Sequence, residues 1–497
     1  MKVTNKDKAF LGVYWMTIMG VASVVIKLLI TMILSRLLLP EQFGQVATIQ
    51  IIISFAEIFW LMGVGSAIVQ KKQLSENYIA TGNTLNLILG LIIYVTIFVF
   101  ASFIVGIVGS DDITMLRVLS IVFVIHSFSG VSEALLQKEM QFKVISIINT
   151  LAALINGAVA IILAFKGFGA WSLVVAQIIS VMLQTVLSII YKPIKFRLKI
   201  EKESAKELLN FGTGYALSKV FNNIASQGDY FVVSQTLGSE ALGFYSRAYQ
   251  LLQVPTNLIA TVMERVLFPL LAMYQDEHEK IRYVVMNLTA LIAILAFPIT
   301  IVSLTMGADL VQVVLGPKWE ETILPFKILI ISLFFRMAYK IGDALVRSLG
   351  AVYKRLLVQI AYATLVIGGA YIGKEWGIAG VALTTTIAII INYLIMTVLI
   401  GHLVELKLRE LLGYLTPIIM VSIVIGGISY LISSFVTLLP YALVRLSVMT
   451  LAVGFMYIFA FKFVIIKYMP EDFRGFIKII KHQTITKFVP KNKNRNN

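Results

Sequence analysis

The chain has 497 residues, of which 59% are hydrophobic and only 14% are charged, and its mean hydropathy is +0.89. Soluble domains contain about 25% charged residues, so the composition excludes a soluble protein and predicts a polytopic membrane protein. The net charge of +16 then indicates contact with the cytoplasmic membrane surface rather than with nucleic acid, and the absence of cysteine excludes disulfides and thiolate sites.

Hydropathy predicts an all-α fold of about fourteen transmembrane helices. The first predicted span contains Lys27 and is too long for the core of a signal peptide, so we expect it to be retained. In chain order, the predicted spans are 10–37, 44–69, 79–107, 113–136, 145–165, 169–191, 208–236, 248–273, 282–306, 322–348, 355–373, 377–400, 411–433 and 441–466.

Loop charges predict the orientation of these spans. With both termini in the cytoplasm, almost all loop lysines and arginines fall on the inner side, as the positive-inside rule requires. This arrangement predicts a multi-pass protein of the cytoplasmic membrane. The basic loop residues left outside are Arg36, Lys166, Arg247, Lys318 and Lys374.

Two basic segments are expected on the cytoplasmic side. Residues 192–207 form a basic linker between spans six and seven. After Met469, the tail places Phe473 and Phe476 among lysines, which is typical of an amphipathic helix on the anionic inner leaflet. Simple solubilising charge is the alternative explanation for both segments.

The chain contains an internal repeat. LSRLLLPEQFG (34–44) returns without gaps as VSQTLGSEALG (233–243), which aligns Gly44 with Gly243. Each copy follows an odd-numbered span, so both have the same orientation. This predicts two parallel six-helix repeats, related by an axis along the membrane normal, as in transporters that bind substrate between their halves.

A second echo supports this division, because KGFGAWSLV (166–174) returns as KEWGIAGVA (374–382). Spans thirteen and fourteen are then an addition to the two lobes. The predicted domains are an N-lobe over 1–191, the basic amphipathic cytoplasmic linker over 192–207, a C-lobe over 208–400, spans thirteen and fourteen within 401–466, and a basic cytoplasmic tail over 467–497.

Ionisable residues stand inside the predicted spans, where each costs at least about 2.5–3.5 kcal/mol unless it faces water or a partner. Several lie at helical spacing, such as Asn257, Thr261 and Glu264 in span eight, and so share one helix face. These polar stripes predict a hydrated central cavity. Its cations, which suit an anionic headgroup such as a phosphate, are Lys27, Lys219, Arg265, Arg336 and Lys340.

Acidic residues accompany the cations, and two roles are open for them. A transporter without ATPase motifs depends on an ion gradient, such as H⁺ or Na⁺, or on the gradient of its substrate. Structural ion pairs are the alternative, above all in the run Lys340–Asp343–Arg347. The candidate cavity or ion-coupling acids are Glu57, Asp229, Glu264 and Asp343.

Enzymatic functions fit the sequence less well. The chain has no HExxH motif, Walker loop or Rossmann fingerprint, and its outer loops are too short for a sugar-transferring site. His126 shares a helical stripe with Glu133 in span four, and we expect it to be structural. The sequence therefore predicts no catalytic residue, no metal site and no cofactor.

Three segments resemble a known family. LSRLLLPEQFGQVAT (34–48), GDYFVVSQTLGSEALGFYSRAYQLLQVP (228–255) and LGPKWEETILPFKIL (315–329) are similar to signatures of Wzx-type polysaccharide flippases in the multidrug/oligosaccharidyl-lipid/polysaccharide exporter superfamily. The resemblance covers the whole chain, and it is most specific in residues 228–255. Within the superfamily, the branch of colanic-acid and teichuronic-acid exporters is the most similar.

The resemblance implies two lobes around a cationic cavity and the transfer of undecaprenyl-pyrophosphate-linked oligosaccharide to the outer leaflet of a bacterial cytoplasmic membrane, for surface polysaccharide biosynthesis. By position, Lys27, Lys219 and Arg265 resemble cations that such flippases use for the pyrophosphate. A polysaccharide polymerase and glycosyltransferases are the implied partners. The alternatives are a lipid II flippase, a cation-coupled multidrug exporter with an acidic and aromatic cavity, and a polytopic glycan polymerase or transferase with a long outer loop.

Overall fold

The computed structural model describes residues 5–60, 64–262, 267, 271 and 277–477, and every regular element within these residues is helical. The predicted all-α fold is thus confirmed. The chain divides into two compact units, which we describe separately. The first comprises residues 1–265, 311–329 and 356–389, and the second comprises residues 266–310, 330–355 and 390–497.

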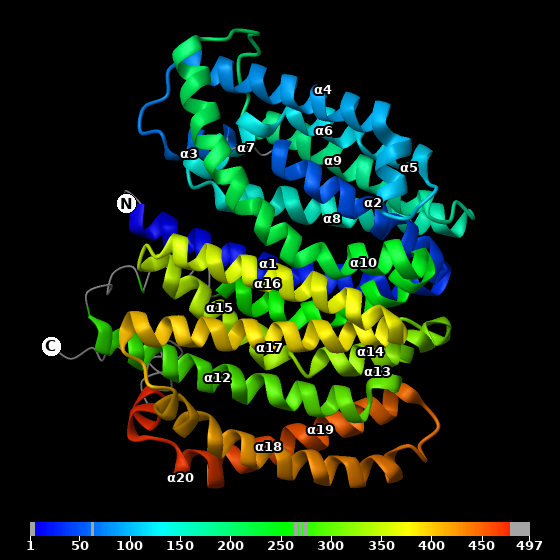
Figure 1. The fold of residues 1–497 in the computed structure, drawn as a ribbon, viewed down its shortest axis with the longest axis vertical. Coiled ribbons are helices and arrows are strands. Elements are labelled where there is room, and N and C mark those ends of the chain that lie inside the picture. Colours follow the sequence, from blue (N-terminus) through cyan, green and yellow to red (C-terminus); the bar gives the residue numbers. More distant parts are fainter. Residues whose placement is uncertain (1–4, 61–63, 263–266, 268–270, 272–276, 478–497) are drawn as a thin grey trace, which may run out of the picture. The chain divides into compact units, whose positions relative to one another are not determined.

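The first unit is a bundle in which long helices lie side by side (Figure 1). α8 packs against α1 and α9, and α2 packs against α10. Up to residue 262 its helices are α1 (Asn5–Leu37), α2 (Pro40–Trp60), α3 (Val64–Gln70), α4 (Glu76–Ile107), α5 (Ile113–Leu119), α6 (Ile121–Ser127), α7 (Gly130–Lys138), α8 (Phe142–Phe165), α9 (Trp171–Tyr191) and α10 (Lys202–Val262).

The second unit packs α12 against α15, α18 and α19. A partly buried ion pair joins α19 to α13, because the Nη2 of Arg445 lies 2.6 Å from Oδ1 of Asp309. The helices of this unit are α12 (His278–Thr305), α15 (Leu333–Ser348), α18 (Leu408–Val436), α19 (Ala442–Ala460), the π-helix η4 (Phe461–Ile465) and α20 (Ile466–Tyr468).

Four helices are divided between the two units. They are α13 (Gly307–Val314), α14 (Ile323–Ile330), α16 (Val352–Gly373) and α17 (Gly377–Val404). The short 3₁₀ helices η2 (Pro317–Thr322) and η3 (Lys374–Trp376) belong to the first unit.

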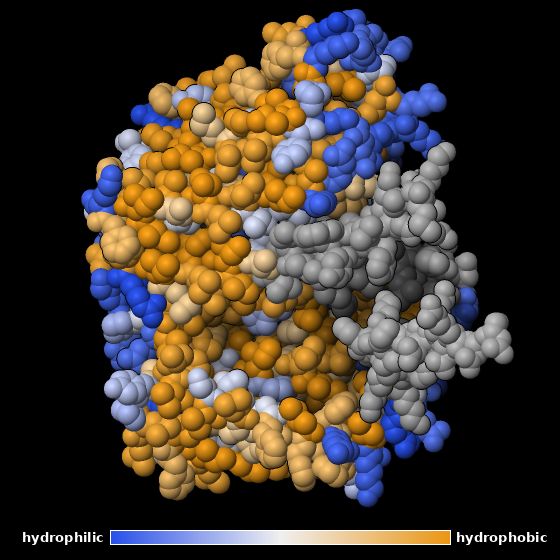
Figure 2. All heavy atoms as spheres, turned by 180° about the vertical axis from the view of Figure 1, so that it is seen from behind, coloured by the Kyte–Doolittle hydropathy of each residue, from blue (hydrophilic) through white to orange (hydrophobic). Residues whose placement is uncertain are grey.

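The exposed surface is that of a membrane protein. Apolar side chains cover most of the face in Figure 2, and hydrophilic residues gather along its margins. By length and apolarity, eight described helices qualify as membrane spans, or up to ten if each of two bent pairs is one span. The number of fourteen spans therefore stays a prediction. Predicted spans seven and eight both fall largely within one helix, α10, which bends at Gly238.

The two copies of the first echo contact each other reciprocally. A Cβ on Gly44 would lie 1.6 Å from the carbonyl oxygen of Ser239, and a Cβ on Gly243 would lie 2.0 Å from that of Pro40. In the repeat, Pro40 aligns with Ser239 just as Gly44 aligns with Gly243. Such exchanged contacts are characteristic of a local two-fold axis. Glycine is required on both sides because the two backbones touch.

Both copies of the second echo have a glycine with positive φ at the equivalent position. Gly169 precedes α9 with a φ of +55°, and Gly377, 208 residues later, begins α17 with a φ of +64°. Residues with side chains rarely adopt this left-handed region. The repeat therefore keeps a glycine where the backbone has a positive φ.

The basic linker lies along the start of α4. Backbone N–H groups of Lys199 and Glu201 donate to the hydroxyls of Thr84 and Thr81, at 3.1 and 3.0 Å. Lys195 also forms an ion pair with Glu76 of the same helix. The backbone of the linker is thus bound to α4. The predicted amphipathic helix of the tail is described only to residue 477.

Candidate functional site

A polar cavity of about 660 Å³ lies inside the first unit and contains Lys27. We call it the cationic cavity. Lys27 projects from α1 with an exposed side chain and has no ion pair among the described residues. No acidic residue is among its described lining. The polar lining residues are Ser23, Lys27, Thr31, Asn149, Asn156, Gln177, Ser180, Gln184, Arg247 and Gln250.

The second cation of this cavity is Arg247 on α10. Its guanidinium lies 4.2 Å from the centroid of the Phe43 ring, and its Nη1 donates to Oε1 of Gln250. Gln250 in turn donates to the hydroxyl of Thr31 on α1 at 3.1 Å. The Nε–H of Arg247 is buried without an acceptor among the described residues. The side chain is therefore held in place while keeping a donor for an additional partner.

Sequence reasoning missed Arg247 because it placed this residue in an outer loop. The helical stripe of Asn257, Thr261 and Glu264, extended seven and ten residues back from Asn257, passes through Gln250 and Arg247. That spacing was the available signal. Low hydropathy around residues 235–247 predicts a loop there, whereas in the structure α10 continues through this region after the bend at Gly238.

None of the other predicted cations is among the described lining residues of this cavity. The side chain of Lys219 and the whole of Arg265 and Glu264 lie outside the described residues. Arg336 and Lys340 are half-buried on α15 in the second unit, and each has an interaction partner. Their predicted roles in substrate binding stay predictions.

Asp343 has the environment of a structural ion pair. Its carboxylate lies 3.1 Å from Nε of Arg347 and 2.5 Å from Nε of Arg355, and the side chain is buried. Asp229, on α10, is also buried and accepts hydrogen bonds from the Tyr245 hydroxyl at 2.7 Å and the Tyr230 amide at 2.9 Å. Neither acid lines the cationic cavity.

We expect the substitution Asp343→Asn to lower the free energy of unfolding by about 1–3 kcal/mol, because two partly buried guanidinium groups lose their counter-charge. A reduced melting temperature of the purified protein would show this loss. Transport per folded molecule should change little. If the variant melts like the wild type but transports poorly, Asp343 acts in transport rather than in folding.

A second cavity of about 450 Å³ lies next to the first, and two carboxylates and His126 are on its lining. We call it the acidic cavity. Glu57 of α2 and Glu133 of α7 both line it, and no lysine or arginine is among its described lining residues. Asn149 and Gln184 line both cavities. The two spaces are therefore neighbours in one bundle.

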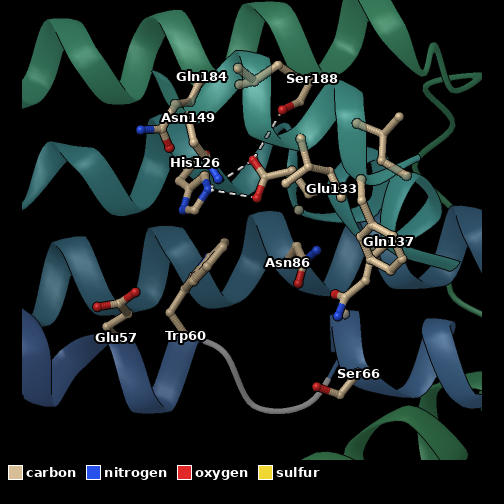
Figure 3. A pocket seen from close by; sticks show the side chains of 17 residues that line it. Glu57, Trp60, Ser66, Asn86, His126, Glu133, Gln137, Asn149, Gln184 and Ser188 are labelled. Atoms are coloured by element: carbon tan, nitrogen blue, oxygen red, sulfur yellow. Dashed lines mark hydrogen bonds and ion pairs between the residues drawn. The ribbon is translucent and has the colours of Figure 1, made fainter. Parts of the chain in front are cut away.

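Glu133 is held firmly at the wall of the acidic cavity (Figure 3). The two oxygens of its carboxylate lie 3.1 and 3.2 Å from Nε2 of His126, and the Ser129 hydroxyl donates to it at 2.8 Å. The ring of Trp60 stacks on His126 with a centroid distance of 4.5 Å. These contacts hold His126 between Glu133 and Trp60, and its structural role stays a prediction. Glu57 and Gln137 also line the cavity, and their side chains are exposed.

Residues 33–324 match the family model described as "Polysaccharide biosynthesis protein". The chain belongs to this family. The match includes α2 to α10 and therefore most of both cavities.

Two curated relatives extend the similarity along the chain. "Lipopolysaccharide biosynthesis protein WzxC" of Escherichia coli (strain K12) is 26% identical over 79% of this chain and 81% of its own length. "Teichuronic acid biosynthesis protein TuaB" of Bacillus subtilis (strain 168) is 25% identical over 76% of this chain and 79% of its own. The first name agrees with the resemblance to Wzx-type proteins, and the second agrees with the teichuronic-acid branch.

Two solved structures have a fold similar to that of this chain. The "Lipid II flippase MurJ, inward closed conformation" matches with a TM-score of 0.73 and 16% identity, over 90% of this chain and 98% of its own. An inward-facing "multidrug resistance MATE family transporter of the MOP superfamily" matches with a TM-score of 0.60 and 18% identity, over 78% and 99%. At these identities the likeness concerns the fold.

Proposed function

We propose that the protein translocates polyprenyl-pyrophosphate-linked oligosaccharide from the inner to the outer leaflet of the bacterial cytoplasmic membrane by alternating access. One observation supports this above the others: Lys27 and Arg247 come from distant helices into one polar cavity without acidic lining among the described residues. The names of the relatives support the glycan part of the substrate. The proposal includes cytoplasmic termini, which the loop charges favour.

The physical requirement is to move a diphosphate past hydrocarbon. An ionised group in an apolar medium is strongly disfavoured unless it is paired. Lys27 and the Nε–H of Arg247 offer charge-assisted hydrogen bonds, and the amides of Asn156 and Gln177 supply neutral donors and acceptors. The polyprenyl tail would stay in lipid while the headgroup crosses within the wet cavity.

The proposal is tested with the full chain in proteoliposomes that contain fluorescently labelled undecaprenyl-pyrophosphate-N-acetylglucosamine. We expect the protein to make the inner pool of label accessible to an external reductant, while a labelled phosphatidylcholine stays protected. Protein-free vesicles give the background rate. If the pyrophosphate lipid and phosphatidylcholine cross at the same rate, the protein is a non-selective scramblase and the proposal fails.

A further inference from the structure

At one end of the first unit, α2 and α10 touch each other through their backbones. This is the end at which α1 finishes and α2 begins, and the loop charges predict that it faces outward. Besides the paired glycine contacts, the Thr48 hydroxyl lies 2.8 Å from that of Ser234, and both side chains are buried. The Ser234 hydroxyl also donates to the carbonyl oxygen of Val108 at 2.7 Å. A substrate can therefore pass between α2 and α10 at this end only if the two helices separate.

The motif LGPKW (315–319) lies at this end and has no part in the proposed binding of the pyrophosphate. Gly316 has a φ of +103°, which favours glycine, and it stands in the turn between α13 and η2. Trp319 of η2 is fully buried, and its indole N–H donates to the carbonyl oxygen of Ser35 at 2.8 Å. The motif thus binds the end of α1.

The hydrogen bond from Trp319 satisfies a carbonyl group at the end of a helix. The last four C=O groups of a helix have no N–H partner within it, and Ser35 stands in the last turn of α1, which ends at Leu37. The N–H of Leu39, four residues after Ser35, donates instead to Oε1 of Gln42 at 2.9 Å. Trp319 therefore supplies a donor that α1 itself does not provide.

Arg36 makes the reciprocal contact. Its Nη2 donates to the carbonyl oxygen of Val313 at 2.6 Å, and its Nη1 donates to that of Val314 at 3.3 Å. These are the last two residues of α13. A cation at the carbonyl end of a helix is favourable, because it satisfies free C=O groups and complements the helix dipole. The end of α1 and the segment 313–319 therefore each cap a helix end or carbonyl of the other.

The indole ring of Trp319 also contacts both repeats. Its centroid lies 5.4 Å from that of Phe43 on α2 and 6.0 Å from that of Phe244 on α10, both in edge-to-face geometry. Phe43 lines the cationic cavity and carries the guanidinium of Arg247 over its ring. We propose that Trp319 acts as a latch, a contact that holds α2 against α10 and breaks when the cationic cavity opens at this end. This inference rests on the proposed function, because alternating access requires such an opening.

The contacts of Trp319 are weak enough to break in each transport cycle. Toward the first repeat they comprise one neutral hydrogen bond, to Ser35, and one aromatic pair, with Phe43. Contacts of these two kinds together shift an equilibrium by about 10- to 100-fold. Such a shift keeps most molecules closed at this end and still allows them to open.

The experiment measures opening as the rate at which a water-soluble maleimide labels a buried cysteine in the full chain in lipid nanodiscs. The protein has no cysteine of its own. Ser234→Cys reports separation of α2 from α10, and Ser132→Cys, equally buried on α7, reports general unfolding. We expect Trp319→Phe, which keeps a ring and removes the N–H, to speed labelling of Ser234→Cys about fivefold, as the loss of one hydrogen bond gives. Labelling of Ser132→Cys should not change.

Trp376→Phe is the matched control, because the Trp376 side chain is exposed, and it should change neither rate. If Trp319→Phe speeds labelling of Ser234→Cys and Ser132→Cys equally, Trp319 stabilises the fold as a whole and is not a latch. If it changes neither rate, its hydrogen bond does not hold this end closed. Either result overturns the proposal.

A crosslink tests whether this end opens during transport. Glu41 and Glu240 are exposed and occupy equivalent positions of the repeat. In Glu41→Cys/Glu240→Cys, a short cleavable bis-maleimide should stop translocation, and cleavage should restore it. If the linked protein translocates at the unlinked rate, the latch proposal is wrong. If no form translocates the pyrophosphate lipid, yet Trp319→Phe selectively speeds labelling of Ser234→Cys, the proposed function fails and the latch stands.

Discussion

Loss of both cations from the cationic cavity, in the double variant Lys27→Ala/Arg247→Ala, is expected to abolish translocation. Each charge-assisted hydrogen bond contributes about 1.5–3 kcal/mol, so losing two should weaken binding of undecaprenyl pyrophosphate by about a hundredfold or more. Lys27 is exposed to the cavity and Arg247 retains a buried Nε–H without an acceptor among the described residues. Both groups are thus suited to a ligand. Lipid binding in nanodiscs and translocation in proteoliposomes measure the two effects.

The double variant Lys166→Ala/Arg117→Ala is the matched control. It removes the same two charges from the first unit at positions that line neither cavity. We expect it to bind and translocate like the wild type. Lys27→Arg keeps a cation and should retain most of the activity. If the cavity variant folds and translocates at the wild-type rate, Lys27 and Arg247 are merely structural and the proposed mechanism is wrong.

The substitution Gly44→Ala is expected to destabilise the first unit strongly. Its new Cβ would lie 1.6 Å from the carbonyl oxygen of Ser239, which belongs to the backbone and cannot move aside by changing rotamer. Forcing α2 and α10 apart should cost about 1–3 kcal/mol or more, as in other overpacked sites. Gly243→Ala, with a 2.0 Å approach to Pro40, should have a similar effect. Thermal unfolding in detergent measures both.

A matched control comes from α4. Gly106 has open space where its Cβ would stand, so Gly106→Ala should be neutral or stabilising by about 0.4–1 kcal/mol, because alanine restricts the unfolded chain. Since Gly44 and Gly243 meet in one contact region, the double alanine variant should lose less than the sum of the single losses. Unchanged melting of Gly44→Ala would contradict the close packing of the two repeat copies.

Much of the fold could be predicted from local sequence. Apolar stretches long enough to cross a bilayer must form helices, because lipid cannot satisfy free backbone N–H and C=O groups. The motif at 228–255 indicates the family from the sequence alone, and Gly44 and Gly243 form a repeated pair. Hydropathy predicts polar helices poorly, and for this reason it assigns Arg247 of α10 to a loop.

The candidate site was only partly predictable. Lys27 was identified because a lysine in an apolar helix needs a wet or charged environment. Its pairing with Arg247, its separation from the acids in the neighbouring cavity, and the position of Asn149 and Gln184 between the two spaces could not be derived. Likewise, Asp343 was expected among the cavity acids or in an ion pair, and the proximity of Arg355 is a property of the packed chain.

The sequence by itself determined the membrane environment, the helical class, the repeat and the family, because these depend on composition, spacing and short motifs. Only the tertiary structure determines which charged side chains lie in the same cavity. Lys27 and Arg247 are far apart along the chain, and only the packing of α1, α2 and α10 brings them into one cavity. Helix faces are visible in a sequence, but the partner of each face depends on crossing angles and close contacts such as Gly44 against Ser239, which no local pattern specifies.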